Sequence, residues 1–278
     1  MEKFDVKNAV IRRRSVRTFD GLPLSKAVRK DLLTYAENLE NPFKVNVRFV
    51  MLDRSSGDKK ENLSTNGIIN GTDLFICSAV PKNAPFNLEA CGYAFERMVL
   101  YAASLGVGTT IIAGTFNRKA FEKAMHLGEA EIMPVVSPLG HEAEKQSIKE
   151  KAMRKAVKAD IRKGWNEIFF DGDFSVPLRR DKAGIYEDAF EAVNLAPSAV
   201  NRQPWIVLKQ DYVFHFYENH SKGMGSNYDS DIQRTDMGIA ACHFILSMSE
   251  KGVECRLEKL EGVQSGPAGS DYSFSIIC

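Results

Sequence analysis

The chain has 278 residues, of which 44% are hydrophobic and 26% are charged, so it has ample length for one or two globular domains. Its formal net charge of +1 gives no support to nucleic acid or an acidic surface as the main partner. No apolar run approaches the ~20 residues of a membrane span, and the first residues lack the apolar core of a signal peptide.

The cysteines and histidines indicate a chain without metal or disulfide sites. The number of cysteines is five, which is odd, and no two of them form a CxxC pair. The histidines show no metal-ligand spacing. The sequence therefore predicts reduced thiols in a cytoplasmic protein, with neither a zinc site nor a disulfide framework.

Hydrophobic periodicity predicts alternating helices and strands along the first half of the chain. The helix at 88–105 is apolar nearly all round, so we expect it to be buried. Residues 141–163 are rich in charge and are interpreted as a linker between two halves. Helices are expected at 5–14, with Asp5 as N-cap, at 25–39, at 88–105 and at 119–125, and strands at 45–52, 73–80, 109–113 and 132–139.

A short polar loop from Ser198 to Gln203 lies between two prolines in the second half. Pro197 moves Ala196 out of helical geometry, so the preceding helix should end there. The residues from Trp205 onward are aromatic and β-branched, as in a buried strand. A rigid polar loop between a helix and a strand is typical of a ligand contact, although a plain helix–strand connection has the same pattern.

Two elements of the first half recur in the second half. A shift of 146 positions pairs Gly92 with Gly238, so the buried helix occurs twice. A shift of 156 positions pairs Phe49 with Trp205, so the helix–loop–strand unit also occurs twice. Chance similarity is the alternative explanation. If the repeat is real, the two copies of the buried helix should pack near a pseudo-two-fold axis.

Two segments resemble signatures of the FMN-dependent nitroreductase family. Residues 196–205, APSAVNRQPW, are similar to its PSxxNxQPW loop, here called the Pro-Ser loop. Residues 13–19, RRSVRTF, are similar to its RRSxRxF segment, here called the Arg segment. The family forms homodimers with two FMN sites, and each site takes the Arg segment from one subunit and the Pro-Ser loop from the other. In the family the two signatures lie close together in the chain, whereas here about 180 residues separate them.

Each half of this chain keeps only one signature. Residues 167–176 read EIFFDGDFSV, without arginine, where a second Arg segment would stand. The chain thus resembles a fused, pseudo-dimeric, single-chain member of the family, like its thermophile-type nitroreductases. The resemblance implies an α+β fold with two similar halves, each an antiparallel-rich sheet flanked by helices. The halves are expected at 1–145 and 146–278, with the linker at about 141–163.

The resemblance also implies which residues bind FMN, since no GxGxxG or Walker loop occurs to hold its phosphate. Guanidinium groups bind phosphate through paired hydrogen bonds, and Arg13 and Ser15 are the expected phosphate ligands. Arg17 matches a position near the pyrimidine edge of the flavin. A solvated basic face is the alternative for these cations. The other expected contacts are Arg14, Ala113, Gly114, Arg162, Lys163, Pro197, Ser198, Ala199 and Asn201. No side chain is expected to be catalytic, because the chemistry takes place at flavin N5.

The leading hypothesis is a flavoenzyme that passes hydride from NAD(P)H through FMN to a nitroaromatic, quinone or similar small-molecule acceptor. The alternatives are a flavin-modifying or dehalogenating enzyme on the same fold and an FMN-binding protein without reductase activity. Because the two-fold partner is fused, we expect a monomer that binds one FMN. The second, pseudo-symmetric site should be empty or filled by side chains such as Phe169 and Phe43.

Overall fold

The computed structural model describes residues 4–55, 62–220 and 232–278, and the chain divides into two compact units, Met1–Ala159 and Asp160–Cys278. Unit 1 contains α1 (Val6–Arg12), α2 (Lys26–Glu37), β1 (Arg48–Asp53), β2 (Leu74–Pro81), α3 (Asn87–Ser104), β3 (Gly108–Thr109), α4 (Arg118–Ala124), β4 (Glu131–Ile132), β5 (Val136–Gly140) and α5 (Ile148–Ala156). Unit 2 contains α6 (Trp165–Ile168), β6 (Phe169–Asp171), β7 (Asp173–Pro177), α7 (Arg180–Ala183), α8 (Glu187–Leu195), β8 (Trp205–Gln210), β9 (Val213–Asn219), α9 (Gln233–Glu250), β10 (Arg256–Glu258) and β11 (Ser270–Ile277), with short 3-10 turns at Gly184–Tyr186 and Ala199–Asn201.

The first helices follow the predicted capping. Asp5 accepts a hydrogen bond from the Asn8 amide at the start of α1, and Ser25 accepts one from the Val28 amide at the start of α2. The strand expected at 132–139 is split into β4 and β5, because Pro134 lies between them and has no N–H for the ladder. The strand expected at 109–113 is shorter than predicted, since β3 has only two residues.

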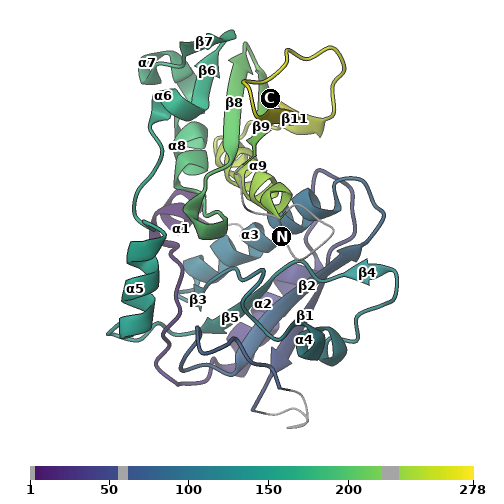
Figure 1. Cartoon of the computed structure of the whole chain (residues 1–278), viewed down its shortest axis with the longest axis vertical. Helices are drawn as coiled ribbons and strands as arrows, with labels where there is room; N and C mark the ends of the chain where they lie inside the picture. The colour runs from purple at the N-terminus through teal and green to yellow at the C-terminus, as the bar shows by residue number, and fades with distance from the viewer. Residues whose placement is uncertain (1–3, 56–61, 221–231) are drawn as a thin grey trace. The chain divides into compact units, whose positions relative to one another are not determined.

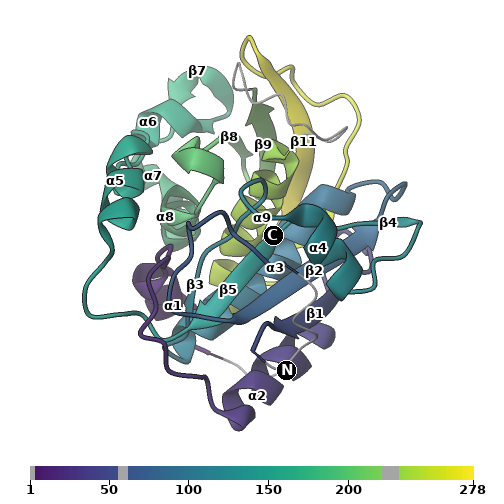
Figure 2. The same ribbon diagram turned by 60° about the horizontal axis from the view of Figure 1, so that its bottom comes forward.

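The sheet of unit 1 has the order β1-β2-β5-β3, with β4 also paired to β2. Alternate residues of β2 point to opposite faces. Phe75 packs on Phe121 of α4, and Ser78 lies 3.2 Å from the thiol of Cys91 in α3. Helices α3 and α4 therefore cover opposite faces of this sheet (Figure 2).

The sheet of unit 2 has the order β10-β11-β9-β8-β6-β7, and β6 pairs with β8 in parallel. Helices α8 and α9 lie against it (Figure 1), where Phe190 and Phe244 form an aromatic core with Phe214 and Phe216 of β9. Trp205, the first residue of β8, is fully buried as expected.

The two units share one strand order. The order β1-β2-β5-β3 in unit 1 corresponds to β8-β9-β11-β10 in unit 2. In each unit a helix precedes the first of these strands, and the second strand is followed by a helix of 18 residues, α3 or α9.

The cysteine prediction was wrong in one respect, because Cys255 and Cys278 form a disulfide. Arg256 pairs with Ile277 across β10 and β11, so the next residues outward, the two cysteines, lie opposite each other. The other three cysteines are buried free thiols. The expectation of a reducing compartment was based on the absence of disulfides, so this bond removes its basis.

Across the described residues, no helix combines the length and apolar character needed to cross a membrane. The same residues contain no group of three or more histidine, cysteine, aspartate or glutamate side chains that could hold a metal ion.

Candidate functional site

The Arg segment is fixed to unit 1 by its backbone and by two apolar side chains. The Val16 amide donates to the Thr109 carbonyl at 2.8 Å, and the Phe19 amide donates to the Asn70 carbonyl at 2.9 Å. Val16 and Phe19 are buried in the core. A Cβ on Gly71 would lie 2.1 Å from the Phe19 carbonyl oxygen, so only glycine allows this close approach.

Arg13 forms a buried ion pair at the end of α1. Its Nε lies 3.7 Å from the Oε1 of Glu96 in α3, and the exposed fractions of the two side chains are 8% and 0%. Burial lowers the pKa of the Arg13 guanidinium, Glu96 raises it, and Arg154 lowers it. The Arg13 Nε donates no hydrogen bond. Arg13 therefore balances a buried carboxylate and retains unused donor capacity.

Arg17 is half-buried and makes no side-chain hydrogen bond or ion pair with any residue in the described ranges. Burial lowers the pKa of its guanidinium, the carboxylate of Glu150 raises it, and the like charge of Arg154 lowers it. The donors of this guanidinium meet no hydrogen-bond acceptor among the described residues. It is therefore suited to bind an anionic ligand.

Arg14 differs from its neighbours because it is exposed and already paired. Its Nε donates to the Oε2 of Glu142 at 2.8 Å. Arg14 also lines a surface pocket of about 520 Å³ with Lys145 and Lys151. Ser15, by contrast, is half-buried and forms an isolated bridge to Thr109. Ser15 thus lies beside Thr109, from which the chain continues to Ala113 and Gly114.

Ala113 and Gly114 lie in the irregular stretch after β3. Ile112 exchanges backbone hydrogen bonds with Val136, and the Ala113 carbonyl accepts a hydrogen bond from Arg118 at 2.6 Å. Gly114 is exposed, and a Cβ there would meet no atom within 4 Å. Unit 1 therefore brings the Arg segment and this stretch to neighbouring positions through the Ser15–Thr109 bridge.

The Pro-Ser loop begins and ends where the prolines predict. Helix α8 ends at Leu195, and Ala196 has an extended ψ of 143°. The Ser198 hydroxyl oxygen accepts the Gln203 amide hydrogen at 2.8 Å, which closes the loop. The Gln203 side chain accepts from the Lys163 amide at 2.8 Å and donates to the Asn201 carbonyl at 3.3 Å, so it holds the backbone of the loop.

A carboxylate of α9 also holds the loop. Both oxygens of Asp236 accept from the Ala199 amide, at 3.0 and 3.1 Å, and Asp236 is 3% exposed. The chain is strained at this point, since Val200, Asn201 and Gln203 have φ of 44°, 58° and 48°. Non-glycine residues keep a positive φ only where the surrounding contacts hold the backbone in that conformation, which is often the case at functional sites.

Replacing Val200 with asparagine should raise the free energy of unfolding by about 1 kcal/mol, because asparagine tolerates positive φ better than a β-branched residue. The Val200 side chain is 52% exposed, so little packing is lost. Urea denaturation of both proteins measures the change. Val176→Asn is the matched control, since Val176 is 49% exposed without positive φ. A control that gains as much stability as the Val200 variant would contradict the strain interpretation.

Arg162 and Lys163 both lie beside the Pro-Ser loop in unit 2. The Arg162 guanidinium donates to Asn201 Oδ1 at 2.6 Å and to the Leu195 carbonyl at 3.3 Å, so it holds the loop. Burial lowers the pKa of the Lys163 ammonium, Glu167 raises it, and Arg202 lowers it. Lys163 rather than Arg162 therefore presents a half-buried cation for a ligand.

The two aromatic residues expected to fill a second cofactor site each pack against aromatic rings of their own unit. Phe169 is fully buried in unit 2, with its ring 4.8 Å from the rings of both Trp165 and Phe190. Phe43 packs against Phe86 in unit 1 at 5.7 Å. The expectation that these two side chains fill a second cofactor site stays a prediction.

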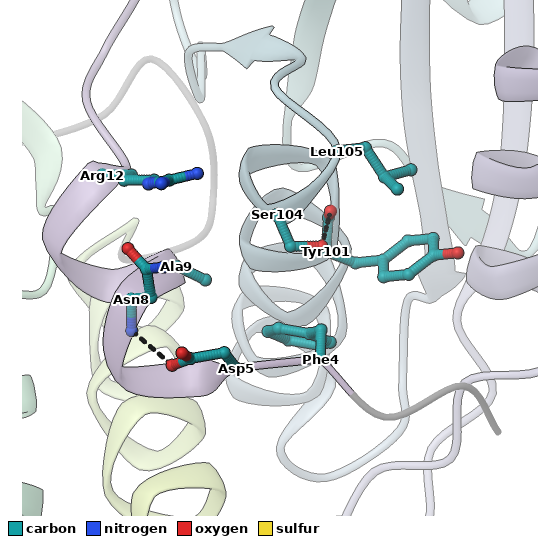
Figure 3. A pocket seen from close by; sticks show the side chains of 8 residues that line it. All are labelled: Phe4, Asp5, Asn8, Ala9, Arg12, Tyr101, Ser104 and Leu105. Carbon is teal, nitrogen blue, oxygen red and sulfur yellow. Dashed lines mark hydrogen bonds between the residues drawn. The ribbon is translucent and has the colours of Figure 1, made fainter.

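A second pocket, of about 270 Å³, lies in unit 1 between α1 and the C-terminal part of α3 (Figure 3). Arg12 and Asp5 stand on its α1 side, and Asp5 is engaged in capping Asn8. No residue of the Arg segment lines it. The polar groups that line this pocket are exposed, and no buried polar groups point into it together. The pocket therefore lacks the features of a cofactor site.

Sequence reasoning missed the carboxylates that position the site residues. Glu96, Glu150 and Asp236 are each under 5% exposed, and each contacts a signature segment far away in the sequence. An acidic residue in an otherwise apolar helix does not by itself indicate burial, because the same pattern occurs where the acid is exposed.

A family profile described as "Putative TM nitroreductase" matches residues 5–248. The crystal structure of a "putative nitroreductase" from Thermotoga maritima resembles this chain with a TM-score of 0.62 and 17% identity, over 100% of this chain and 95% of its own. A "Putative NADH dehydrogenase/NAD(P)H nitroreductase" from Bacteroides thetaiotaomicron has a TM-score of 0.43 and 21% identity, over 51% of this chain and 89% of its own. An "FMN-dependent Nitroreductase" from Clostridium difficile has a TM-score of 0.42 and 18% identity, over 50% of this chain and 89% of its own. No curated protein matches the chain.

The likeness to the Thermotoga protein shows that the chain has a nitroreductase-like α+β fold. The family profile spans most of the chain and includes both the Arg segment and the Pro-Ser loop. The resemblance inferred from these two segments is confirmed: the chain belongs to the family described as "Putative TM nitroreductase" and is a nitroreductase-type oxidoreductase.

Proposed function

We propose that the protein is an FMN-dependent NAD(P)H oxidoreductase that reduces a nitroaromatic, quinone or similar small-molecule acceptor. The observation that carries the proposal is the half-buried guanidinium of Arg17, which has no acceptor in the described part of the chain and lies within electrostatic reach of Arg154. A phosphate dianion matches such a set of donors in charge and geometry. The names of similar solved proteins, which mention FMN and NAD(P)H, agree with this choice.

The described residues fit FMN in two parts. In unit 1, the Nε of Arg13 donates no hydrogen bond and Arg17 has no acceptor among the described residues, so Arg13 can serve the phosphate and Arg17 the pyrimidine edge of the flavin. In unit 2, the Ser198 oxygen accepts from Gln203, which leaves its hydroxyl hydrogen to be donated. When bound, FMN supplies the atom that accepts and donates hydride. The chain's own residues bind it, orient it and place positive charge near it.

The proposal is tested by the absorption spectrum of the purified protein and its response to NADH and NADPH without oxygen. A flavin spectrum that bleaches with either nucleotide, and recovers with a nitroaromatic or a quinone, is the expected result. A protein that holds FMN but does not bleach would be a flavin protein without reductase activity. A protein that takes up no flavin from excess FMN would contradict the proposal altogether.

We further propose that unit 1 and unit 2 derive from the two subunits of an ancestral dimer and that one FMN site remains. The shared strand order of the two units supports this view. In unit 2 the segment that would replace the Arg segment forms part of α6, β6 and β7 and carries Glu167, Asp171 and Asp173. Carboxylates repel a phosphate dianion, and no arginine in that segment compensates.

The expected stoichiometry is therefore one FMN per chain in a monomer. Flavin released by denaturation, divided by the chain concentration, gives this ratio, and light scattering gives the mass of the loaded protein. A ratio near two would mean that the second copy also binds flavin. A ratio near one that is found only in a dimer would mean that the site forms between separate chains.

A further inference from the structure

A series of hydrogen bonds links His215 to the loop that follows β10, on the face of the unit 2 sheet turned away from α8 and α9. The His215 Nδ1 lies 2.7 Å from the Ser275 hydroxyl, and this hydroxyl lies 2.7 Å from that of Tyr272. The Tyr272 oxygen accepts the Leu260 amide hydrogen at 2.9 Å. On the other side of the ring, Nε2 lies 3.0 Å from Gln210 Oε1. His215 is 5% exposed and Ser275 is fully buried, so the centre of this network is shielded from water.

The direction of each hydrogen bond follows from the groups at its two ends. The Gln210 Nε2 donates to the Gly172 carbonyl at 3.1 Å, so Gln210 presents its oxygen to the ring and can only accept there. The imidazole therefore carries its hydrogen on Nε2 and accepts on Nδ1. Ser275 donates to Nδ1, Tyr272 donates to Ser275, and the Leu260 amide donates to Tyr272. With a neutral ring, every hydrogen of the network has an acceptor.

Protonation of His215 adds one hydrogen more than the network can accept. The two contacts that join His215, Ser275 and Tyr272 then face three hydrogens, one on Nδ1 and one on each hydroxyl. One hydroxyl hydrogen loses its acceptor, and a positive charge is added to a buried ring. Both effects cost free energy. Burial accordingly lowers the pKa of the His215 imidazole.

The charged groups around His215 give no net attraction for a proton. The titratable and charged side chains contributed by the surrounding elements are Tyr217 of β9, Tyr272 of β11, Arg256 and Glu258 of β10, Lys259 of the loop, and Lys209 of β8 with its partner Asp171 of β6. Glu258 pairs with Arg256 at 2.8 Å, so its charge is compensated. The Lys259 ammonium lies 4.1 Å from the centre of the Tyr272 ring, and its positive charge disfavours a second one nearby. Lys209 lies on the opposite face of the sheet, because its neighbour Leu208 is the residue that pairs with His215.

We infer that His215 is a pH-sensitive switch: the neutral ring holds the loop after β10 at Leu260, and the protonated ring releases it. The loop carries Val263, which packs against an apolar cluster that includes Tyr217 on this face of the sheet. Tyr217 also donates to the Gln264 carbonyl at 2.6 Å, and this contact does not involve the histidine. Acid therefore loosens the loop at Leu260 while its attachment at Gln264 remains. The inference concerns unit 2 alone and does not depend on flavin binding.

The test compares unfolding by urea at about pH 7.5 and about pH 5.5. The unfolded chain binds a proton at this histidine near pH ~6.5, whereas the folded chain binds it only at lower pH. The stability contributed by the neutral ring is therefore present above pH ~6.5 and is lost as the pH falls below it. We expect His215 to raise the unfolding equilibrium constant by up to about tenfold between the two pH values. His215→Gln should remove this part of the pH dependence. His141→Gln, which removes an exposed histidine, should leave it unchanged.

A second measurement uses the unaltered chain and does not require that a variant folds. Nitrogen NMR should find the His215 hydrogen on Nε2 at neutral pH. The protection factor of the Leu260 amide against hydrogen exchange should fall by about tenfold as the ring is protonated. The Leu178 amide, which donates to the Phe169 carbonyl elsewhere in unit 2, should keep its protection. A hydrogen on Nδ1 at neutral pH, or equal protection of Leu260 before and after protonation, would overturn the inference. A His215→Gln chain that keeps the full pH dependence would overturn it as well.

Discussion

Arg13→Ala should lower the free energy of unfolding by about 3 kcal/mol, the usual scale for removing one partner of a buried ion pair. Glu96 is fully buried in α3, and Arg13 is the cation 3.7 Å from it. The substitution leaves a carboxylate in the core without its arginine. Urea denaturation with no flavin added measures this effect separately from any loss of cofactor binding.

Two further variants make the explanation testable. Arg12→Ala removes the preceding cation of α1, which is exposed, and should change stability little. Glu96→Gln combined with Arg13→Ala should cost less than the sum of the two single changes, because the uncompensated charge is gone. Strict additivity, or an Arg12→Ala loss as large as that of Arg13→Ala, would refute the ion-pair account.

Asp236→Ala should destabilise the protein by about 2 kcal/mol and weaken FMN binding at the same time. The Ala199 amide loses both acceptor oxygens, and the loop with positive φ at Val200, Asn201 and Gln203 loses one of its supports. Asp236 also lies in the first turn of α9, where a negative charge interacts favourably with the helix dipole. Urea denaturation and FMN titration measure the two effects.

Asp236→Asn separates the hydrogen bond from the charge, because the amide keeps an acceptor oxygen. It should retain more stability and more FMN affinity than Asp236→Ala. Asp181→Ala serves as the surface control, since Asp181 is exposed and pairs only with Arg179 in the part of the chain that the structure describes. If Asp236→Ala binds FMN as tightly as the unaltered chain, Asp236 does not position the loop.

The local features of the site could be predicted from the sequence, because proline geometry and capping act over a few residues. The end of α8 at Leu195, the strand at Trp205 and the cap of α1 at Asp5 all follow from such rules. The family could be recognised for the same reason, since each of its signatures is a short segment.

The supports of the site could not be predicted, because each of them joins residues far apart in the chain. Thr18 and Glu150 are separated by 132 positions, and Ala199 and Asp236 by 37. Periodicity predicts that α3 is apolar nearly all round, and it gives no indication that Glu96 within this helix is buried. The disulfide was missed because it depends on the register of β10 against β11, which composition and spacing of cysteines do not contain.

The disulfide at the end of the chain has a practical consequence for chemical labelling. Cys77, Cys91 and Cys242 are buried, and burial raises the pKa of the Cys91 thiol to about 12, so these groups are poor nucleophiles in the folded protein. Cys255 and Cys278 are engaged with each other. Rapid reaction of the native protein with a maleimide probe therefore measures the fraction of molecules in which the bond between Cys255 and Cys278 has been reduced to thiols.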